Sequence, residues 1–323
     1  MKHFCRFKVG FAVLVVSWAL PVFAQTADLN NLRSDFIEFL KQVDAVPSER
    51  YADQFYKSWD VLESKHQEIL DAVSFDKDDP QWKAKRQKKL LKLLETLPQI
   101  RKPMIELFEK ADVVVQNAVD RFVKYFPDLQ DRIPVYIMPS AFSFNGRVTC
   151  VPNSNRAGLF LGVDFIAYRN DNLTLLFSHE FFHVYHSSKL EDSDYESLAF
   201  PLWEEGFATY MSGIMNPSAT DSEILMDEDL AKFCSNPGNL ARIAGEYLKL
   251  LNDNAGEEAY ADWFSASSGT TKPTRRGYCL GLKVIRAVAA KTPLTEMINW
   301  HLPQFDAQVR RELVSLSTQE TVK

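Results

Sequence analysis

The chain has 323 residues, of which 46% are hydrophobic and 25% are charged, and its formal net charge is −6. This is the composition of a folded protein with enough apolar side chains for a large core, and it excludes disordered and fibrous classes. The first 24 residues carry three basic side chains and no acid, so the net charge of the remainder is −9. This acidity argues against a nucleic-acid partner and against electrostatic anchoring to a membrane, so we expect no nucleic acid as a partner.

Residues 1–24 have the pattern of a cleavable export signal. Basic side chains precede an apolar run over residues 9–20, and small or apolar residues lead up to Ala24. The apolar run is shorter than the roughly 20 residues that span a bilayer, so an uncleaved anchor is the weaker alternative. We therefore predict cleavage after Ala24, a periplasmic or secreted mature protein, and no stable membrane span after cleavage.

After the signal, residues 25–128 are expected to form a helical region. From Asp28 to about Phe126, apolar residues recur at helical spacing. Pro98 is expected to end one helix and Pro103 to open the next. No residues in this region have a spacing typical of catalysis, so the region is assigned a role as a scaffold or a substrate cradle.

The sequence changes character near residue 129. Three short segments, rich in β-branched or aromatic residues and separated by turn residues, predict a small sheet: 133–137, 147–151 and 158–163. The cluster at residues 170–172 predicts the cap of a helix that begins at Leu173. From about Trp203, helical segments alternate with turns. We therefore expect an α+β fold, mainly α, with a small mixed sheet beside that helix and residues 129–323 as one domain.

Three cysteines follow the predicted signal: Cys150, Cys234 and Cys279. In an oxidising compartment, two of them can form a disulfide and leave one free thiol. Burial of all three as small apolar side chains is an equally good interpretation. The sequence does not choose a pair.

The helix from Leu173 carries the motif His179-Glu180-Phe181-Phe182-His183. Two histidines four apart on a helix lie on one face, with their Cβ atoms roughly 5–6 Å apart. This spacing suits two neutral imidazoles on one zinc ion, with the intervening Glu180 able to reach a water molecule. The alternative is a pair of core histidines without a metal, but it leaves Glu180 unexplained. We therefore expect a metal site.

A catalytic zinc ion needs a third protein ligand and one open position. Glu205 precedes Gly206 near the start of a later helix, and Gly206 is expected to let that helix pack closely against the motif helix. Glu204 lies about 100° away around the helix and is expected to face elsewhere, so Glu205 is preferred as the ligand. His186 is about 10.5 Å further along the axis than the first histidine, and is assigned to the cleft wall or an outer hydrogen bond. Thr209 is a candidate for orienting a ligand histidine.

A motif H-E-x-x-H followed by a Glu-Gly-Phe-Ala helix resembles the gluzincin metallopeptidases. The fragment Trp203–Ala208 is similar to that of the aminopeptidase N-like enzymes, and the chain also resembles a group of predicted bacterial zinc proteases with a Gly-Tyr-x-x-Gly segment, here Gly277–Gly281. The resemblance covers roughly residues 133–290. It implies a zincin-like catalytic domain with one Zn²⁺ per chain, and these ligands: His179, His183 and Glu205.

The resemblance also implies catalytic roles for Glu180 and Tyr278. Glu180 would be the general base that activates water and passes the proton to the leaving amine. Tyr278 would hydrogen-bond the tetrahedral oxyanion. Arg275 or Arg276 is a candidate for binding a substrate carboxylate, with a solvated loop arginine as the alternative.

Two features depart from the aminopeptidase pattern. The spacer between His183 and Glu205 has 21 residues, which is longer than in those enzymes, and no Gly-x-Met-Glu-Asn segment precedes the motif helix. An endopeptidase or a differently specific exopeptidase therefore fits better than an aminopeptidase.

The sequence as a whole predicts an exported zinc-dependent peptidase that acts on protein or peptide substrates. One alternative is an inactive zinc-binding protein of the periplasm with a binding or chaperone-like role, against which the presence of both Glu180 and Tyr278 argues. The other is a zinc amidase that acts on cell-wall peptides, which nothing in the sequence excludes.

Overall fold

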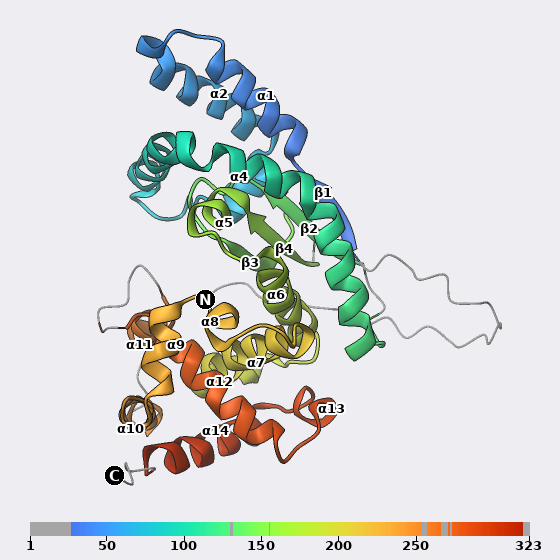
Figure 1. Ribbon diagram of the computed structural model, residues 1–323, viewed down its shortest axis with the longest axis vertical. Helices are drawn as coiled ribbons and strands as arrows, with labels where there is room; N and C mark the ends of the chain where they lie inside the picture. Colours follow the sequence, from blue (N-terminus) through green and yellow to red (C-terminus); the bar gives the residue numbers. More distant parts are fainter. Residues whose placement is uncertain are drawn as a thin grey trace, which may run out of the picture. The chain divides into compact units, whose positions relative to one another are not determined.

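The computed structural model describes residues 27–129, 132–154, 156–252, 257–265, 271 and 273–318. The predicted export signal lies outside these residues. The chain forms two compact units, residues 1–180 and 181–323 (Figure 1). In the described ranges, no helix combines the length and apolar character that crossing a membrane requires.

The first unit contains a four-stranded mixed sheet with the order β1-β2-β4-β3. Its strands are β1 (Ala27–Asn31), β2 (Ile133–Met138), β3 (Gly146–Cys150) and β4 (Ala157–Gly162). The two central strands, β2 and β4, pair in parallel, β1 is parallel to β2, and β3 is antiparallel to β4. The three predicted strands are confirmed, and so is the α+β, mainly α fold class.

Strand β1 corrects the prediction that the chain is helical throughout from Asp28. Asp28 is paired with Pro134 of β2, and Leu29 is paired with Val135. The partner strand lies far along the sequence, so the local spacing of apolar residues contains no sign of this pairing. Part of the region predicted to be purely helical therefore belongs to the sheet.

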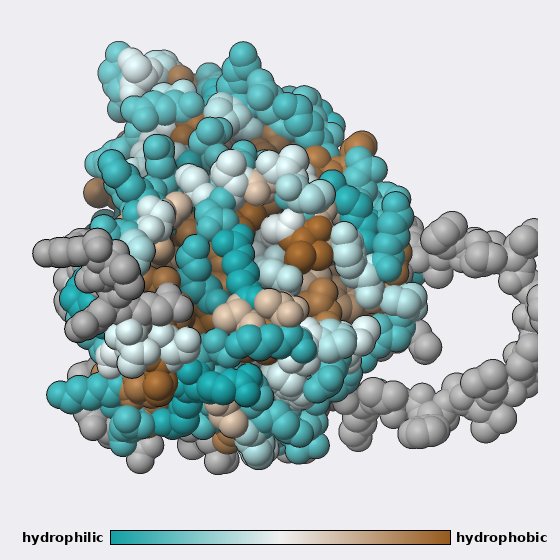
Figure 2. Space-filling view, turned by 60° about the horizontal axis from the view of Figure 1, so that its bottom comes forward, coloured by the Kyte–Doolittle hydropathy of each residue, from teal (hydrophilic) through white to brown (hydrophobic). Residues whose placement is uncertain are grey.

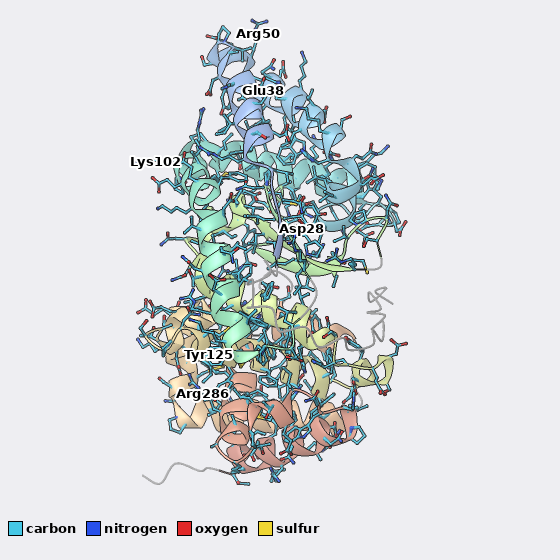
Figure 3. All side chains as sticks on the ribbon, turned by 90° about the vertical axis from the view of Figure 1, so that its right-hand side faces the viewer. Asp28, Glu38, Arg50, Lys102, Tyr125 and Arg286 are labelled. Atoms are coloured by element: carbon cyan, nitrogen blue, oxygen red, sulfur yellow. A yellow bond between two sulfur atoms is a disulfide. The ribbon has the colours of Figure 1, made fainter. Side chains whose placement is uncertain are left out.

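The helices of the first unit are α1 (Arg33–Asp44), α2 (Tyr51–Lys65), α3 (Gln67–Val73), α4 (Trp82–Tyr125) and α5 (Val163–Arg169). Helix α4 contains both Pro98 and Pro103, so the prediction of two separate helices was wrong. Figure 3 shows one continuous ribbon that includes Lys102 and ends at Tyr125.

A continuous buried stripe explains why α4 does not stop at its prolines. A proline inside a helix costs about 3 kcal/mol or more, because it removes a hydrogen bond and its ring clashes with the preceding turn. The buried apolar residues of α4 continue at helical spacing on both sides of the prolines: Leu90, Leu93, Leu97, Ile100, Met104, Phe108, Ala111, Val115, Ala118, Val119 and Phe122. Burial of each large apolar side chain stabilises the folded state by about 1.5–3 kcal/mol. The sum over this stripe outweighs the cost of the two prolines.

Helix α6 (Leu173–Ser187) continues from the first unit into the second. The remaining helices of the second unit are α7 (Ala199–Met215), α8 (Asp221–Leu225), α9 (Glu228–Ser235), α10 (Pro237–Asn252), α11 (Glu257–Phe264), α12 (Arg276–Ala289), α13 (Leu294–Met297) and α14 (Leu302–Ser317). Aromatic rings fill the core between α7 and α14, where Trp203 stacks on Phe305 with ring centroids 5.9 Å apart.

Helices α7 and α12 are in backbone contact at two glycines. A Cβ atom added at Gly206 would lie 2.4 Å from the carbonyl carbon of Gly281, and one added at Gly281 would lie 2.5 Å from the carbonyl oxygen of Leu202. Only glycine fits at such a close approach. The prediction that Gly206 allows tight packing is therefore right, but its partner is α12 and not the motif helix.

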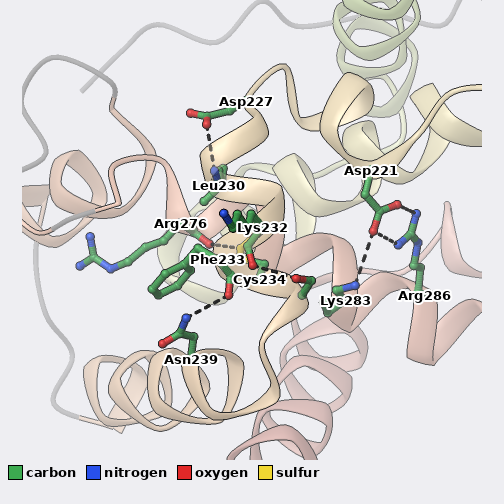
Figure 4. The surroundings of a disulfide bond; sticks show 12 residues. Asp221, Asp227, Leu230, Lys232, Phe233, Cys234, Asn239, Arg276, Lys283 and Arg286 are labelled. Atoms are coloured by element: carbon green, nitrogen blue, oxygen red, sulfur yellow. Dashed lines mark hydrogen bonds and ion pairs between the residues drawn. A yellow bond between two sulfur atoms is a disulfide. The ribbon is translucent and has the colours of Figure 1, made fainter.

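A disulfide between Cys234 and Cys279 joins α9 to α12 (Figure 4). The two Cα atoms are 6.4 Å apart, within the usual range for a disulfide, and both side chains are buried. Arg286 of α12 also makes an ion pair with Asp221 of α8, at 2.6 Å. Helix α12 is thus fixed to two neighbouring helices, and no cysteine of the described residues is a free thiol.

The exposed large apolar side chains are spread over several helices. On the face shown in Figure 2, apolar residues lie in small patches among hydrophilic ones. The most exposed are Val61, Leu91, Val113, Tyr125, Tyr168, Tyr260 and Val314. Scattered residues of this kind are normal on folded proteins.

Candidate metal centre

The motif histidines lie in the interior of helix α6. Asn172 caps the helix start, because its Oδ1 accepts hydrogen bonds from the backbone N–H groups of Thr174 and Leu175, at 3.0 and 3.3 Å. Most side chains in the middle of the helix are buried, among them Phe177 and Phe181. A helix that is apolar on most faces is held by its surroundings, so the positions of its histidines are fixed. The predicted cap and helix start are confirmed.

Three predicted ligand residues come together. The side chains of His179 and His183 are 3% and 8% exposed, and Glu205 of α7 is half-buried. One possible ligand atom from each of the three residues lies within 4.8 Å of the others. Two imidazoles and one carboxylate form a donor set that catalytic zinc sites use. The residues present therefore fit a zinc ion.

Both acids of α7 contact His183. Oε2 of Glu205 lies 3.4 Å from Nε2 of His183, and Oε1 of Glu204 lies 3.4 Å from Nδ1. The prediction that Glu204 faces elsewhere was wrong, because a glutamate side chain is long enough to reach the same ring from a neighbouring position. Burial by itself lowers the pKa of His183, but the charges of Glu205 and Glu204 outweigh it and raise the pKa well above its usual value. The two carboxylates thus favour positive charge at this position, as a divalent cation would supply.

Glu180 lies against the first residue of β3. A Cβ atom added at Gly146 would lie 2.5 Å from Cγ and 2.6 Å from Oε1 of Glu180, so a larger residue would displace that carboxylate. Strand β3 forms one edge of the sheet. The predicted general base is therefore beside an edge strand. The role of Gly146 could not be predicted from its neighbours in the sequence, because a glycine at the start of a strand resembles an ordinary turn residue.

Tyr278 lies in the first turn of α12 and is half-buried. It precedes Gly281 by three residues, and Gly281 contacts Gly206, the residue after Glu205. The close crossing of α7 and α12 thus involves the turns that carry Glu205 and Tyr278. The guanidinium of Arg275 lies over the Tyr278 ring, 4.4 Å from its centroid.

His186 and Thr209, which the sequence suggested as supports for the metal ligands, are both buried in the protein interior. His186 is fully buried and stacks on Phe182, with ring centroids 5.3 Å apart, and burial lowers its pKa to about 3. It is therefore a neutral core residue outside the group of three ligands, and lines no cleft wall. Thr209 donates its hydroxyl hydrogen bond to the backbone carbonyl of Glu205, at 2.7 Å.

The two arginines before Tyr278 differ in their surroundings. Arg276 is 3% exposed, forms an ion pair with Asp262, and lies over the ring of Trp263 at 4.0 Å. This is the environment of a structural arginine. Of the two candidates for binding a substrate carboxylate, only Arg275 is still suitable.

The candidate centre lies in a part of the chain that matches a known protein family. No curated protein and no solved structure matches the chain. A family model, DUF5700, described as "Putative zinc dependent peptidase", matches residues 33–302, which include every residue of the candidate centre. The match covers most of the chain, so the protein belongs to this family of zinc-dependent peptidases.

Proposed function

We propose that the protein is an exported zinc peptidase of the gluzincin type, with Glu180 as its general base. The observation that carries this proposal is the convergence of His179, His183 and Glu205, with Glu180 between the two histidines in the same helix. The donor set suits zinc, and the position of Glu180 suits proton transfer during peptide hydrolysis.

The three ligands would hold one Zn²⁺ per chain. When bound, the ion would act as a Lewis acid that lowers the pKa of water and polarises a carbonyl group. Burial of His179 and His183 keeps bulk water away from their rings. Their fixed positions on one turn of α6 make them ready for binding without a large rearrangement.

Glu180 would take a proton from the attacking water on a carboxylate oxygen and deliver it to the leaving nitrogen. Its contact with Gly146 supports this assignment, because the carboxylate is held beside the edge strand β3. The free edge of a strand offers backbone N–H and C=O groups to an extended peptide. A substrate paired with β3 would therefore pass close to Glu180.

Tyr278 would donate a hydrogen bond to the oxyanion of the tetrahedral intermediate. Support comes from the contact between Gly206 and Gly281, which ties the first turns of α12 to the helix of Glu205. The disulfide at the next residue, Cys279, further restrains this part of α12.

Export is supported by the predicted signal over residues 1–24 and by the disulfide between Cys234 and Cys279. Structural disulfides persist mainly in oxidising compartments such as the periplasm. The mature protein is thus proposed to be periplasmic or secreted, with a protein or peptide as its substrate.

The direct test is a comparison of the protein without residues 1–24 and its Glu180→Ala variant. Wild type should contain one zinc per chain and cleave casein or a peptide library. Glu180→Ala should keep its zinc and lose at least about 100-fold in turnover, the usual contribution of a general base. Undiminished hydrolysis by the variant would contradict the assignment, and cleavage of peptidoglycan fragments alone would indicate the amidase.

A further inference from the structure

The imidazole of His183 is contacted on both nitrogens by carboxylates from consecutive residues. Glu205 lies 3.4 Å from Nε2, and Glu204 lies 3.4 Å from Nδ1. Only Glu205 belongs to the group of three residues whose ligand atoms lie close together. The two acids therefore have different positions relative to the candidate metal.

A histidine that binds a metal must keep a lone pair on the coordinating nitrogen and carry its proton on the other one. An acceptor at that second nitrogen selects the tautomer, fixes the plane of the ring and makes the coordinating nitrogen more basic. At His183, the nitrogen that faces Glu205 is Nε2. The nitrogen that needs an acceptor is then Nδ1, which faces Glu204.

We propose that Glu204 is a positioning residue that orients His183 through Nδ1 and leaves Nε2 for the metal. This inference rests on the proposed metal centre and adds a fourth residue to it. Glu204 acts through His183 and does not contact the ion.

The burial of the three side chains supports this role. The exposed fraction of the side chain is 10% for His183, 23% for Glu204 and 12% for Glu205. A contact with so little exposure is screened less by water and salt than one on the surface. The distance of 3.4 Å is longer than an ordinary N–H···O hydrogen bond, so a small movement of either side chain would complete it.

The test measures zinc affinity of the metal-free mature protein by competition with a chromophoric chelator. Glu204→Ala should bind zinc 10- to 100-fold more weakly than wild type, the usual effect of losing such an outer partner, with one site retained. Glu204→Gln should fall between the two, because its amide oxygen still accepts from Nδ1–H but carries no charge. Glu228→Ala, which removes an exposed acid of α9, should match wild type.

A second measurement separates positioning from general destabilisation. Metal-free Glu204→Ala should keep the circular dichroism spectrum of wild type and one cooperative thermal transition, at a somewhat lower midpoint because His183 loses one of its two carboxylate contacts. The absorption spectrum of its Co²⁺ form should change because the His183 ring has lost its fixed orientation. Glu205→Ala provides the reference for the loss of a ligand, and should lose stoichiometric zinc.

Three results would overturn the inference. If Glu204→Ala binds zinc as tightly as wild type while Glu205→Ala does not, the metal centre stands and the role of Glu204 is wrong. If Glu204→Ala loses stoichiometric zinc and Glu205→Ala keeps it, Glu204 is itself the ligand. If wild type binds no zinc, the proposed function fails together with the inference.

Discussion

At His186, an imidazole ring lies inside a cluster of aromatic side chains, 5.3 Å from the Phe182 ring and 5.6 Å from that of Phe207. Neither ring nitrogen has a hydrogen-bond partner among the described residues. Burial lowers its pKa from the usual 6.5 to about 3, so the folded protein keeps this ring neutral. The unfolded chain has no such restraint and takes up a proton near pH 6.5.

This difference makes the stability of the protein depend on pH. A lowered pKa contributes stability that is present above pH 6.5 and is lost as the pH falls toward 3. Leucine has no proton to gain. We therefore predict that, between pH 7 and pH 4, the free energy of unfolding of His186→Leu falls by ~3 kcal/mol less than that of wild type. At pH 7 it should be at least as stable, since an unsatisfied buried polar group is removed.

Denaturant unfolding of both proteins at several pH values, in the presence of a chelator, measures this difference. The chelator removes metal binding as a source of pH dependence. Parallel curves for wild type and His186→Leu would contradict the account of His186 as a neutral core residue.

At the scale of elements, the crossing of α7 and α12 decides where two candidate functional residues lie. We predict that Gly281→Ala destabilises the protein by about 2 kcal/mol or more, because the added methyl group would lie 2.5 Å from the Leu202 carbonyl oxygen. It should also reduce turnover, since the helices that carry Glu205 and Tyr278 must move apart.

Gly213→Ala is the matched control, in α7, the helix against which Gly281 packs. Among the described residues, a Cβ atom there would meet the Ile224 side chain alone, at 3.4 Å. The change should therefore be tolerated, and helix propensity should add up to about 1 kcal/mol to the free energy of unfolding. Denaturant unfolding and peptide turnover of both variants give the comparison. Equal stability of the two variants would show that the crossing is not tightly constrained.

The helices of the site show which of its features can be predicted from the sequence. The spacing of His179 and His183 is a local pattern, and a helix converts it directly into a shared face, so this part of the site was predictable. The partner of Gly206 and the contact between Glu204 and His183 depend on how separate helices pack. Periodicity within one helix does not contain that information.

Non-local pairing also explains the errors in the fold. Strand β1 exists because residues 27–31 pair with β2, which is distant in sequence. Helix α4 continues through Pro98 and Pro103 because a buried stripe on both sides of them outweighs their local preference to end a helix. In both places tertiary contacts overrule a local signal.

At the scale of the whole molecule, zinc should stabilise the folded chain, because the unfolded chain lacks an assembled site. Free zinc at 100 times its dissociation constant raises the free energy of unfolding by about 2.7 kcal/mol. For a chain of this length that corresponds to a rise of about 4 °C in the thermal midpoint. Glu180→Ala should show the same rise, since Glu180 is not a ligand, whereas His179→Ala should show none.

Differential scanning calorimetry of the metal-free mature protein, with and without added zinc, measures these shifts. The three proteins separate the two roles of the motif, because ligand loss removes the thermal shift while loss of the general base removes only turnover. A shift of the same size in His179→Ala would mean that zinc stabilises the chain from another site, and the ligand assignment would then have to be abandoned.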